Sequence, residues 1–336
     1  MTNLSIKKII LKKTFIIAEI GINHNGSFLK CKKMIDLASK SGANAVKIQT
    51  IDPEESYHKS SPSYNAFYNK NFSLDQLRTL KQFAKKKKII FFSTPGDIAS
   101  LEKLIKLKVK LIKISSGLLT NIPLIEMASK TKAAIILSTG MAIKKDIDRA
   151  IKTLKKNNCS EFYLLKCTSL YPANDILLNL RAMNEMGKQY KIPCGYSDHT
   201  TDELASIAAV SMGAKIIEKH FKLSKHDKCP DKNISLCPKD FNKMCKKIRR
   251  VEKMLGNIKI GCTKEELIIR SKSHRYIFPK QNMKVGELIT FDKLVFKRSS
   301  INGKKLEPRF YSKIVNKKIK KKISADKPIT LDCLQC

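Results

Sequence analysis

The chain has 336 residues, 42% of them hydrophobic, which is enough for a full core and argues against a disordered protein. Lysine and arginine outnumber aspartate and glutamate by 67 to 29, giving a formal net charge of +38. The basic residues are spread along the whole chain and are not interleaved with aromatic residues. The charge therefore favours a solvated lysine-rich surface, which can attract an anionic small substrate, over a nucleic-acid-binding protein.

The sequence predicts neither secretion nor a membrane span. Its first residues (MTNLSIKKIILKKTF) contain too short and too interrupted an apolar run for a signal peptide. No apolar run approaches the roughly 20 residues that a bilayer requires. The ten cysteines are scattered, as expected of free thiols in a reducing cytoplasm, and the C-x-x-C pair of Cys333 and Cys336 stands alone at the chain end. We expect a cytoplasmic protein with no membrane or nucleic-acid partner.

Short apolar runs alternate with longer amphipathic stretches from residue 15 to about residue 257. The predicted strands are residues 15–22, 45–50, 89–94, 111–117, 133–139, 162–169, 192–199 and 214–221. Strands that alternate with helical patterns form βαβ units and a parallel sheet. Eight such units predict a closed (β/α)8 barrel. The competing doubly wound sheet is disfavoured because no G-x-G-x-x-G follows the first strand.

The pattern changes after residue 257. Residues 282–294 and 323–334 resemble each other, with ITFDKL in the first and ITLDCL in the second. Short strands without a long helix predict a small β-rich module. The predicted organisation is a catalytic barrel over residues 1–257, a linker over 258–272 and the module over 273–336.

Polar side chains occur at the ends of all eight predicted strands, where a barrel of this kind places its active site. Lys47, Lys113 and Glu218 interrupt strands that should be continuously apolar, and a buried charge is costly unless it is paired. Lysines with nearby serines, and Ser116 before a glycine that opens a helical stretch, suit a phosphate group.

Two histidines, His199 and His220, end the last two predicted strands. They are one βα unit apart, so a barrel places them on adjacent strands. Imidazoles near carboxylates suit a divalent cation such as Mn²⁺, Co²⁺, Zn²⁺ or Mg²⁺. Hydrogen-bonded scaffold histidines are the alternative, and spacing alone leaves both open.

Long motifs in this chain resemble the sialic acid synthase family. They are FIIAEIGINHNG (15–26), AVKIQT (45–50), STP (93–95), KISSG with NIPLI (113–125), ILSTGM (136–141), CTSLYP (167–172), GYSDHT (195–200) and IIEKHF (216–221). VGELITFDKL (285–294) and KR (297–298) resemble the family's antifreeze-like (SAF) domain. The resemblance implies a TIM barrel followed by a SAF domain. It also implies condensation of phosphoenolpyruvate with an N-acetylmannosamine-type aldose.

The resemblance also implies roles for individual residues. The phosphoenolpyruvate-binding positions are Lys47, Lys113, Ser116, Ser138, Ser169 and Ser197. The metal ligands are His199 and His220, usually with Mn²⁺, and Mg²⁺ or Co²⁺ as alternatives. Glu19 and Asp231 match catalytic carboxylates, and Gln49 and Tyr171 match sugar contacts. Arg298 matches an arginine that one subunit inserts into the other's sugar site, which implies a domain-swapped homodimer.

The resemblance leaves the acceptor open. N-acetylneuraminate synthase is the first expectation, with legionaminate or pseudaminate synthase as alternatives. Residues 53–70, which should shape the sugar pocket, match the family poorly. Leu118 stands where the family usually has an acidic residue, so a catalytically weakened basic binding protein on the same scaffold is a further alternative.

Overall fold

The computed structural model describes residues 6–335, and the chain divides into two compact units, Met1–Gly256 and Asn257–Cys336. Cys336, one half of the C-x-x-C pair, lies outside the described residues. Among the helices described, none combines the length and the apolar character needed to cross a bilayer.

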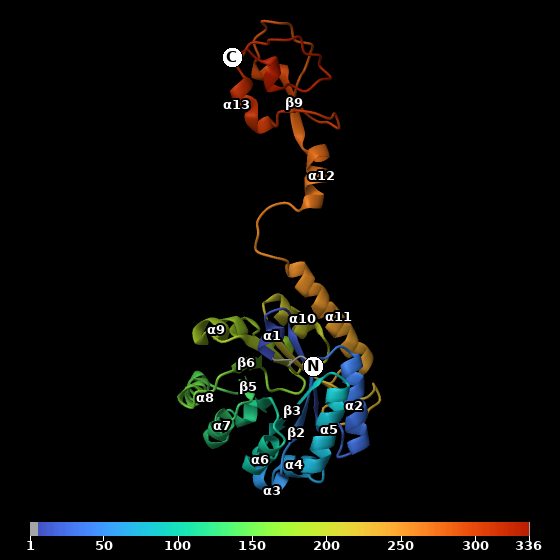
Figure 1. The fold of residues 1–336 in the computed structure, drawn as a ribbon, viewed down its shortest axis with the longest axis vertical. Coiled ribbons are helices and arrows are strands. Elements are labelled where there is room, and N and C mark those ends of the chain that lie inside the picture. The colour runs from blue at the N-terminus through green and yellow to red at the C-terminus, as the bar shows by residue number, and fades with distance from the viewer. Residues whose placement is uncertain (1–5, 336) are drawn as a thin grey trace. The chain divides into compact units, whose positions relative to one another are not determined.

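The first unit is a closed barrel of eight parallel strands in chain order (Figure 1), which confirms the predicted fold class. The strands are β1 (Phe15–Gly21), β2 (Ala45–Thr50), β3 (Ile90–Pro95), β4 (Leu111–Ile114), β5 (Ala134–Ser138), β6 (Phe162–Cys167), β7 (Cys194–Asp198) and β8 (Ile216–His220). The predicted strand 111–117 is shorter than expected because Ser116–Leu118 forms a 3-10 turn, η1.

Helices connect successive strands and pack on the outside of the barrel. They are α2 (Phe28–Lys40), α3 (Pro53–Ser56), α4 (Pro62–Phe67), α5 (Leu74–Lys86), α6 (Ile98–Lys106), α7 (Ile122–Ser129), α8 (Lys144–Lys156), α9 (Arg181–Tyr190), α10 (Leu204–Ser211) and α11 (Pro238–Leu255). A further 3-10 turn, η2 (Asp175–Leu177), precedes α9. One large apolar cluster fills the space between the strands and these helices.

A second apolar cluster fills the interior of the barrel near the start of the strands. It includes Phe15, Leu111 and Ile216, each at or near the first position of its strand. Ile6, Ile9 and Ile10 of the short helix α1 (Ile6–Ile10) belong to the same cluster. Because this part of the lumen is filled, inward-pointing polar side chains lie nearer the carboxyl ends of the strands.

The second unit has its own small core, formed by Ile277, Met283, Ile289, Leu294, Ile314, Ile319, Ile323 and Ile329. It contains an antiparallel pair, β9 (Arg275–Pro279) and β10 (Leu294–Arg298), with α12 (Lys264–Ser273), α13 (Tyr311–Ile314), η3 (Phe291–Lys293), η4 (Pro308–Phe310) and η5 (Leu331–Cys333). The two similar segments each contain one 3-10 turn, η3 or η5. Helix α12 occupies most of the stretch expected to be a linker.

Candidate active site

Two lysine side chains lie in the barrel lumen. Lys47 and Lys113 are only 3% and 2% exposed. They share one carboxylate, because Glu218 Oε1 lies 3.5 Å from the Lys47 Nζ and 3.4 Å from the Lys113 Nζ. The Lys47 Nζ also lies 3.0 Å from Glu19 Oε2. The buried charges that interrupt β1, β2, β4 and β8 are therefore paired with one another, as the cost of burying them requires.

Burial and neighbouring charges shift the pKa values of these four groups in different directions. Burial raises the pKa of Glu19, and it lowers the pKa of Lys113. Burial acts against Lys47 too, but the adjacent carboxylates outweigh it and raise the pKa of that ammonium group. At Glu218 burial is outweighed by Lys113 and Lys47, which hold its pKa at about 2. Glu218 is thus a fixed negative charge between two cations.

Hydroxyl groups line the same part of the lumen. The Lys113 Nζ donates to Ser138 Oγ at 2.6 Å, and Ser197 Oγ donates to Glu218 Oε1 at 3.1 Å. Both serines are almost fully buried. Ammonium and hydroxyl donors that converge in this way suit a phosphate or carboxylate group.

Gly140, just after β5, holds two more hydroxyls close together. Its backbone N–H donates to Ser116 Oγ at 3.0 Å. A Cβ added at this glycine would lie 2.2 Å from Ser169 Oγ and 2.8 Å from Ser116 Oγ. A side chain here would displace both hydroxyls, so the geometry of this pair depends on the glycine.

The two histidines of the predicted metal site are neighbours in space. Their ring centroids are 5.4 Å apart, and Tyr171 stacks on His199 with centroids 4.2 Å apart. His199 Nδ1 donates to the backbone carbonyl of Thr168 at 2.8 Å, which leaves Nε2 as the nitrogen with a lone pair for a ligand bond. His220 Nδ1 lies 3.1 Å from Asp231 Oδ2.

The two imidazoles would suit an open metal site, in which the protein supplies only part of the coordination. Within residues 6–335, no three His, Cys, Asp or Glu side chains are grouped so that they could hold a metal ion by themselves. The chain offers two imidazoles, and water and substrate would complete the coordination. Glu19 Oε1 and Glu218 Oε2 are buried without a hydrogen-bond partner, so the lumen has unused acceptors for such a guest. These residues are compatible with Mn²⁺, Mg²⁺ or Co²⁺.

Two carboxylates and an amide converge beside His220. A Cβ added at Gly21, whose φ is +52°, would lie 3.2 Å from Glu19 Oε1, 3.4 Å from Asp231 Oδ2 and 3.5 Å from Gln49 Oε1. Burial would raise the pKa of Asp231, but the adjacent His220 outweighs it and lowers that pKa. This group of acceptors suits a polyhydroxyl substrate and proton transfer.

Three residues join the cluster although the sequence analysis gave them no role. Glu218 lies between the two lysines. In the sequence it stands out only as a charged residue within a strand that is expected to be buried. Thr94 Oγ1 accepts a hydrogen bond from Lys47 at 3.2 Å. Cys167 Sγ lies 3.7 Å from His199 Nδ1. Thr94 lies in the STP motif and Cys167 in the CTSLYP motif, but neither was given a role, because threonine and cysteine are also found in strands without any site.

Two further residues bear on the predictions made from the sequence. Leu118 is half-buried and packs against the outer apolar cluster, so this position supplies no charge. Arg298 is the exposed last residue of β10 in the second unit. The roles of all the assigned residues remain predictions.

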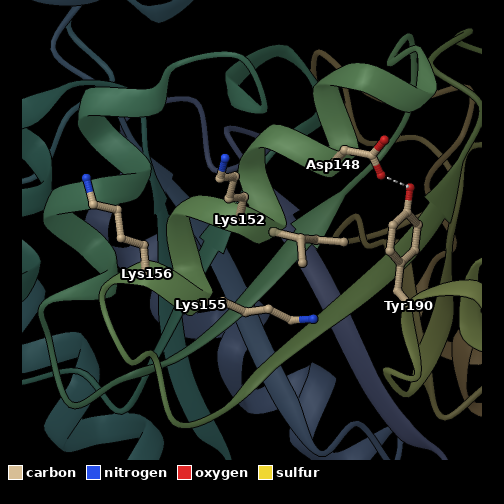
Figure 2. A pocket seen from close by; sticks show the side chains of 6 residues that line it. Asp148, Lys152, Lys155, Lys156 and Tyr190 are labelled. Atoms are coloured by element: carbon tan, nitrogen blue, oxygen red, sulfur yellow. Dashed lines mark hydrogen bonds between the residues drawn. The ribbon is translucent and has the colours of Figure 1, made fainter.

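A surface pocket of about 500 Å³ lies elsewhere on the barrel, between α8 and α9 (Figure 2). Asp148, Ile151, Lys152, Lys155, Lys156 and Tyr190 line it, and Tyr190 donates to Asp148 at 2.8 Å. It contains none of the predicted site residues, so the cluster in the lumen is the candidate active site.

Known proteins resemble this chain over almost its whole length. The profile of the NeuB family matches residues 34–260, and that of the SAF domain matches residues 274–335. N,N'-diacetyllegionaminic acid synthase from Campylobacter jejuni is 36% identical over 328 residues, covering 92% of this chain and 98% of that protein. N-acetylneuraminate-9-phosphate synthase from Homo sapiens is 32% identical over 94% of this chain and 91% of its own length.

A solved structure agrees with these matches. The N-acetylneuraminic acid (sialic acid) synthetase from Leptospira borgpetersenii is 36% identical and superposes with a TM-score of 0.73, over 78% of this chain and 92% of that one.

Proposed function

Because the chain belongs to the NeuB family, whose enzymes condense phosphoenolpyruvate with a sugar, we propose that it is a nonulosonic acid synthase that uses an N-acetylmannosamine-type aldose. One observation carries the proposal: two buried lysines that share Glu218 lie in the same lumen as the His199–His220 pair. The lysines suit the anionic donor, and the histidines would hold the cation that binds the acceptor.

Phosphoenolpyruvate would bind first through its charged groups. Lys47 and Lys113 supply positive charge, and Ser116, Ser138, Ser169 and Ser197 supply hydroxyl groups. Because the lysines are held by carboxylates within the lumen, they are in place before the substrate arrives. Such preorganised donors stabilise the negative charge that grows on the departing phosphate.

The carbon–carbon bond forms when the enol carbon of phosphoenolpyruvate attacks the aldehyde of the open-chain sugar. A divalent cation held by His199 and His220 would polarise that aldehyde as a Lewis acid. Water then adds to the electron-poor carbon that carried the phosphate, and phosphate leaves by C–O cleavage. Glu19 and Asp231 lie beside His220, where they can accept the protons released.

The branches of the family differ in the sugar that accepts phosphoenolpyruvate. N-acetylmannosamine, which would give N-acetylneuraminate, is the first candidate. The precursor of N,N'-diacetyllegionaminic acid is the second candidate. It is favoured by two relatives with that product in their names, at 36% and 35% identity over 92% and 93% of this chain.

The second unit would complete the site of a partner copy. The proposal is a homodimer in which Arg298 of one chain reaches the sugar in the other, as the SAF-domain match suggests. We also propose a cytoplasmic location, which the nine free cysteines among the described residues support.

The test is phosphate release from phosphoenolpyruvate, with and without Mn²⁺, in the presence of N-acetylmannosamine, its 6-phosphate or the diacetamido sugars of the legionaminic and pseudaminic branches. We expect release that requires one of these sugars, increases with Mn²⁺ and is abolished in His220→Ala. Binding of phosphoenolpyruvate without turnover of any of these sugars would refute the proposed reaction. Full Mn²⁺-dependent activity in His220→Ala would remove that residue from the ligand set.

A further inference from the structure

We infer that a buried ion pair behind the two histidines, Asp198 with Lys219, positions them for cation binding. The inference rests on the metal role proposed above for His199 and His220. Asp198 and Lys219 are both 0% exposed, and the Lys219 Nζ lies 3.2 Å from Asp198 Oδ1. Both side chains lie on the outer face of the strands, where Asp198 accepts a hydrogen bond from Ser206 of α10, so both are positioning residues.

The register of β7 and β8 links the pair to the histidines. Asp198 lies directly opposite Lys219 across the two parallel strands. In each chain segment the next residue is a histidine, His199 or His220. Successive side chains in a strand point to opposite faces, so the ion pair faces the helices while the histidines face the lumen. Fixing one pair therefore fixes the backbone from which the other projects.

The ion pair also holds the residue that follows His199. The Lys219 Nζ donates to the Thr200 carbonyl at 2.7 Å and to Thr200 Oγ1 at 3.3 Å. Asp198 Oδ1 accepts from the Thr200 N–H and hydroxyl, both at 2.8 Å. The residues on both sides of His199, Asp198 and Thr200, therefore belong to one hydrogen-bond network. Lys219, which precedes His220, belongs to the same network.

Helix α10 anchors the network from outside. Ser206 Oγ donates to Asp198 Oδ2 at 2.6 Å. Lys219 has three acceptors for its three N–H groups, and both oxygens of Asp198 are hydrogen-bonded. A buried pair with all its hydrogen bonds made has one preferred geometry, whereas apolar side chains of similar volume would allow the strands to shift.

Stability alone does not account for this pair. Replacing a buried ion pair by well-packed neutral side chains is often neutral or stabilising. Outside the lumen, the other side chains of these two strands form an apolar layer that includes Tyr196 and Ile217. We therefore assign the charged pair the task of holding the two histidines in position.

The test is binding of Mn²⁺ alone to the full chain, measured by electron paramagnetic resonance of the free ion. The double variant Asp198→Asn/Lys219→Met removes both charges and keeps the volumes. We expect its Kd for Mn²⁺ to rise about tenfold, the lower end of the effect of losing a group bonded directly to a metal ligand, because this pair acts through the backbone. Its melting temperature and its metal-free affinity for phosphoenolpyruvate should stay close to those of the wild type.

The matched control is Arg249→Met/Glu252→Gln, which removes the 2.8 Å ion pair on α11 and should leave the Mn²⁺ affinity unchanged. Wild-type Mn²⁺ affinity in a folded Asp198→Asn/Lys219→Met variant would overturn the inference, and so would an equal loss of Mn²⁺ and phosphoenolpyruvate binding. If that variant does not fold, Thr200→Val decides: a weaker Mn²⁺ affinity supports the inference and an unchanged one overturns it. A wild-type chain that binds no Mn²⁺ would instead refute the proposed metal site.

Discussion

Glu218 has a different task from the other carboxylates of the lumen. It lies within 3.5 Å of both lysines and accepts a hydrogen bond from Ser197. Its pKa of about 2 keeps it ionised at every physiological pH. Without it, two ammonium groups would share a buried space with only Glu19 to offset them. Glu218 thereby offsets the charge of two buried lysines, which the proposed binding of an anionic donor requires.

Lys113 is the cation whose loss should affect the donor most. In Lys113→Met, Ser138 loses its 2.6 Å partner and the phosphate loses one positive charge. We expect kcat/KM for phosphoenolpyruvate to fall about 100- to 1,000-fold, the effect of removing one charge-stabilising donor. Steady-state kinetics at saturating sugar measures this. Lys106→Met, on the exposed side of α6, is the control, and a loss below threefold in Lys113→Met would exclude phosphate contact.

Gly140→Ala tests the hydroxyl pair. The added methyl group would overlap Ser169 Oγ and crowd Ser116 Oγ, so both side chains must turn away. We expect the KM for phosphoenolpyruvate to rise about tenfold while the melting temperature changes little, because one or two hydrogen bonds to a charged group are lost. Gly117→Ala, where an added Cβ meets nothing within 4 Å, is the matched control. Equal KM values in the two variants would remove Ser116 and Ser169 from the donor site.

The carboxylate of Asp97 links helix α6 to the segment that follows β2. Asp97 is the N-cap of α6 and accepts from Ser100, and its Oδ2 also accepts from the Asp52 N–H at 2.8 Å and the Ser56 hydroxyl at 2.9 Å. This loop begins the segment that should shape the sugar pocket. We therefore expect Asp97 to couple the stability of α6 to the proposed sugar pocket.

Asp97→Ala should lower the stability of the protein and weaken its binding of the sugar. We expect the free energy of unfolding to fall by about 2–4 kcal/mol, from one lost cap and the unsatisfied groups left behind. The KM for the sugar should rise more than the KM for phosphoenolpyruvate. Ser73→Ala removes the cap of α5 without touching the loop and should change only stability, by about 1 kcal/mol. A parallel rise of both KM values in Asp97→Ala would contradict this coupling.

The elements of the barrel could be predicted because each strand is an apolar run bounded by a helical pattern. The end of β4 was predicted three residues too late, because the polar Ser115, Ser116 and Gly117 belong to the loop and the η1 turn rather than to the strand. In the second unit, ITFDKL and ITLDCL resemble strands, but each contains a 3-10 turn. In the site, Lys47 and Lys113 were visible as misplaced charges. The Asp198–Lys219 network was not, since pairing across strands depends on register.

In the proposed dimer, each active site depends on residues of two chains. Arg298→Ala and His220→Ala should each be inactive alone. In an exchanged equal mixture, half of the dimers are mixed, and each mixed dimer has one site with both residues intact. We expect about a quarter of wild-type activity after mixing. No recovery, with subunit exchange shown by mass spectrometry of differently tagged chains, would mean that Arg298 does not act across the dimer.

The fate of the bridging oxygen of phosphoenolpyruvate shows directly whether phosphate leaves by C–O cleavage. Phosphoenolpyruvate labelled with ¹⁸O between carbon and phosphorus is turned over with Mn²⁺ and the active sugar, and the phosphate is examined by ³¹P nuclear magnetic resonance. We expect the phosphate to carry the ¹⁸O, because the C–O bond breaks. Unlabelled phosphate, with ¹⁸O retained in the organic product, would mean P–O cleavage and would contradict the proposed synthase reaction.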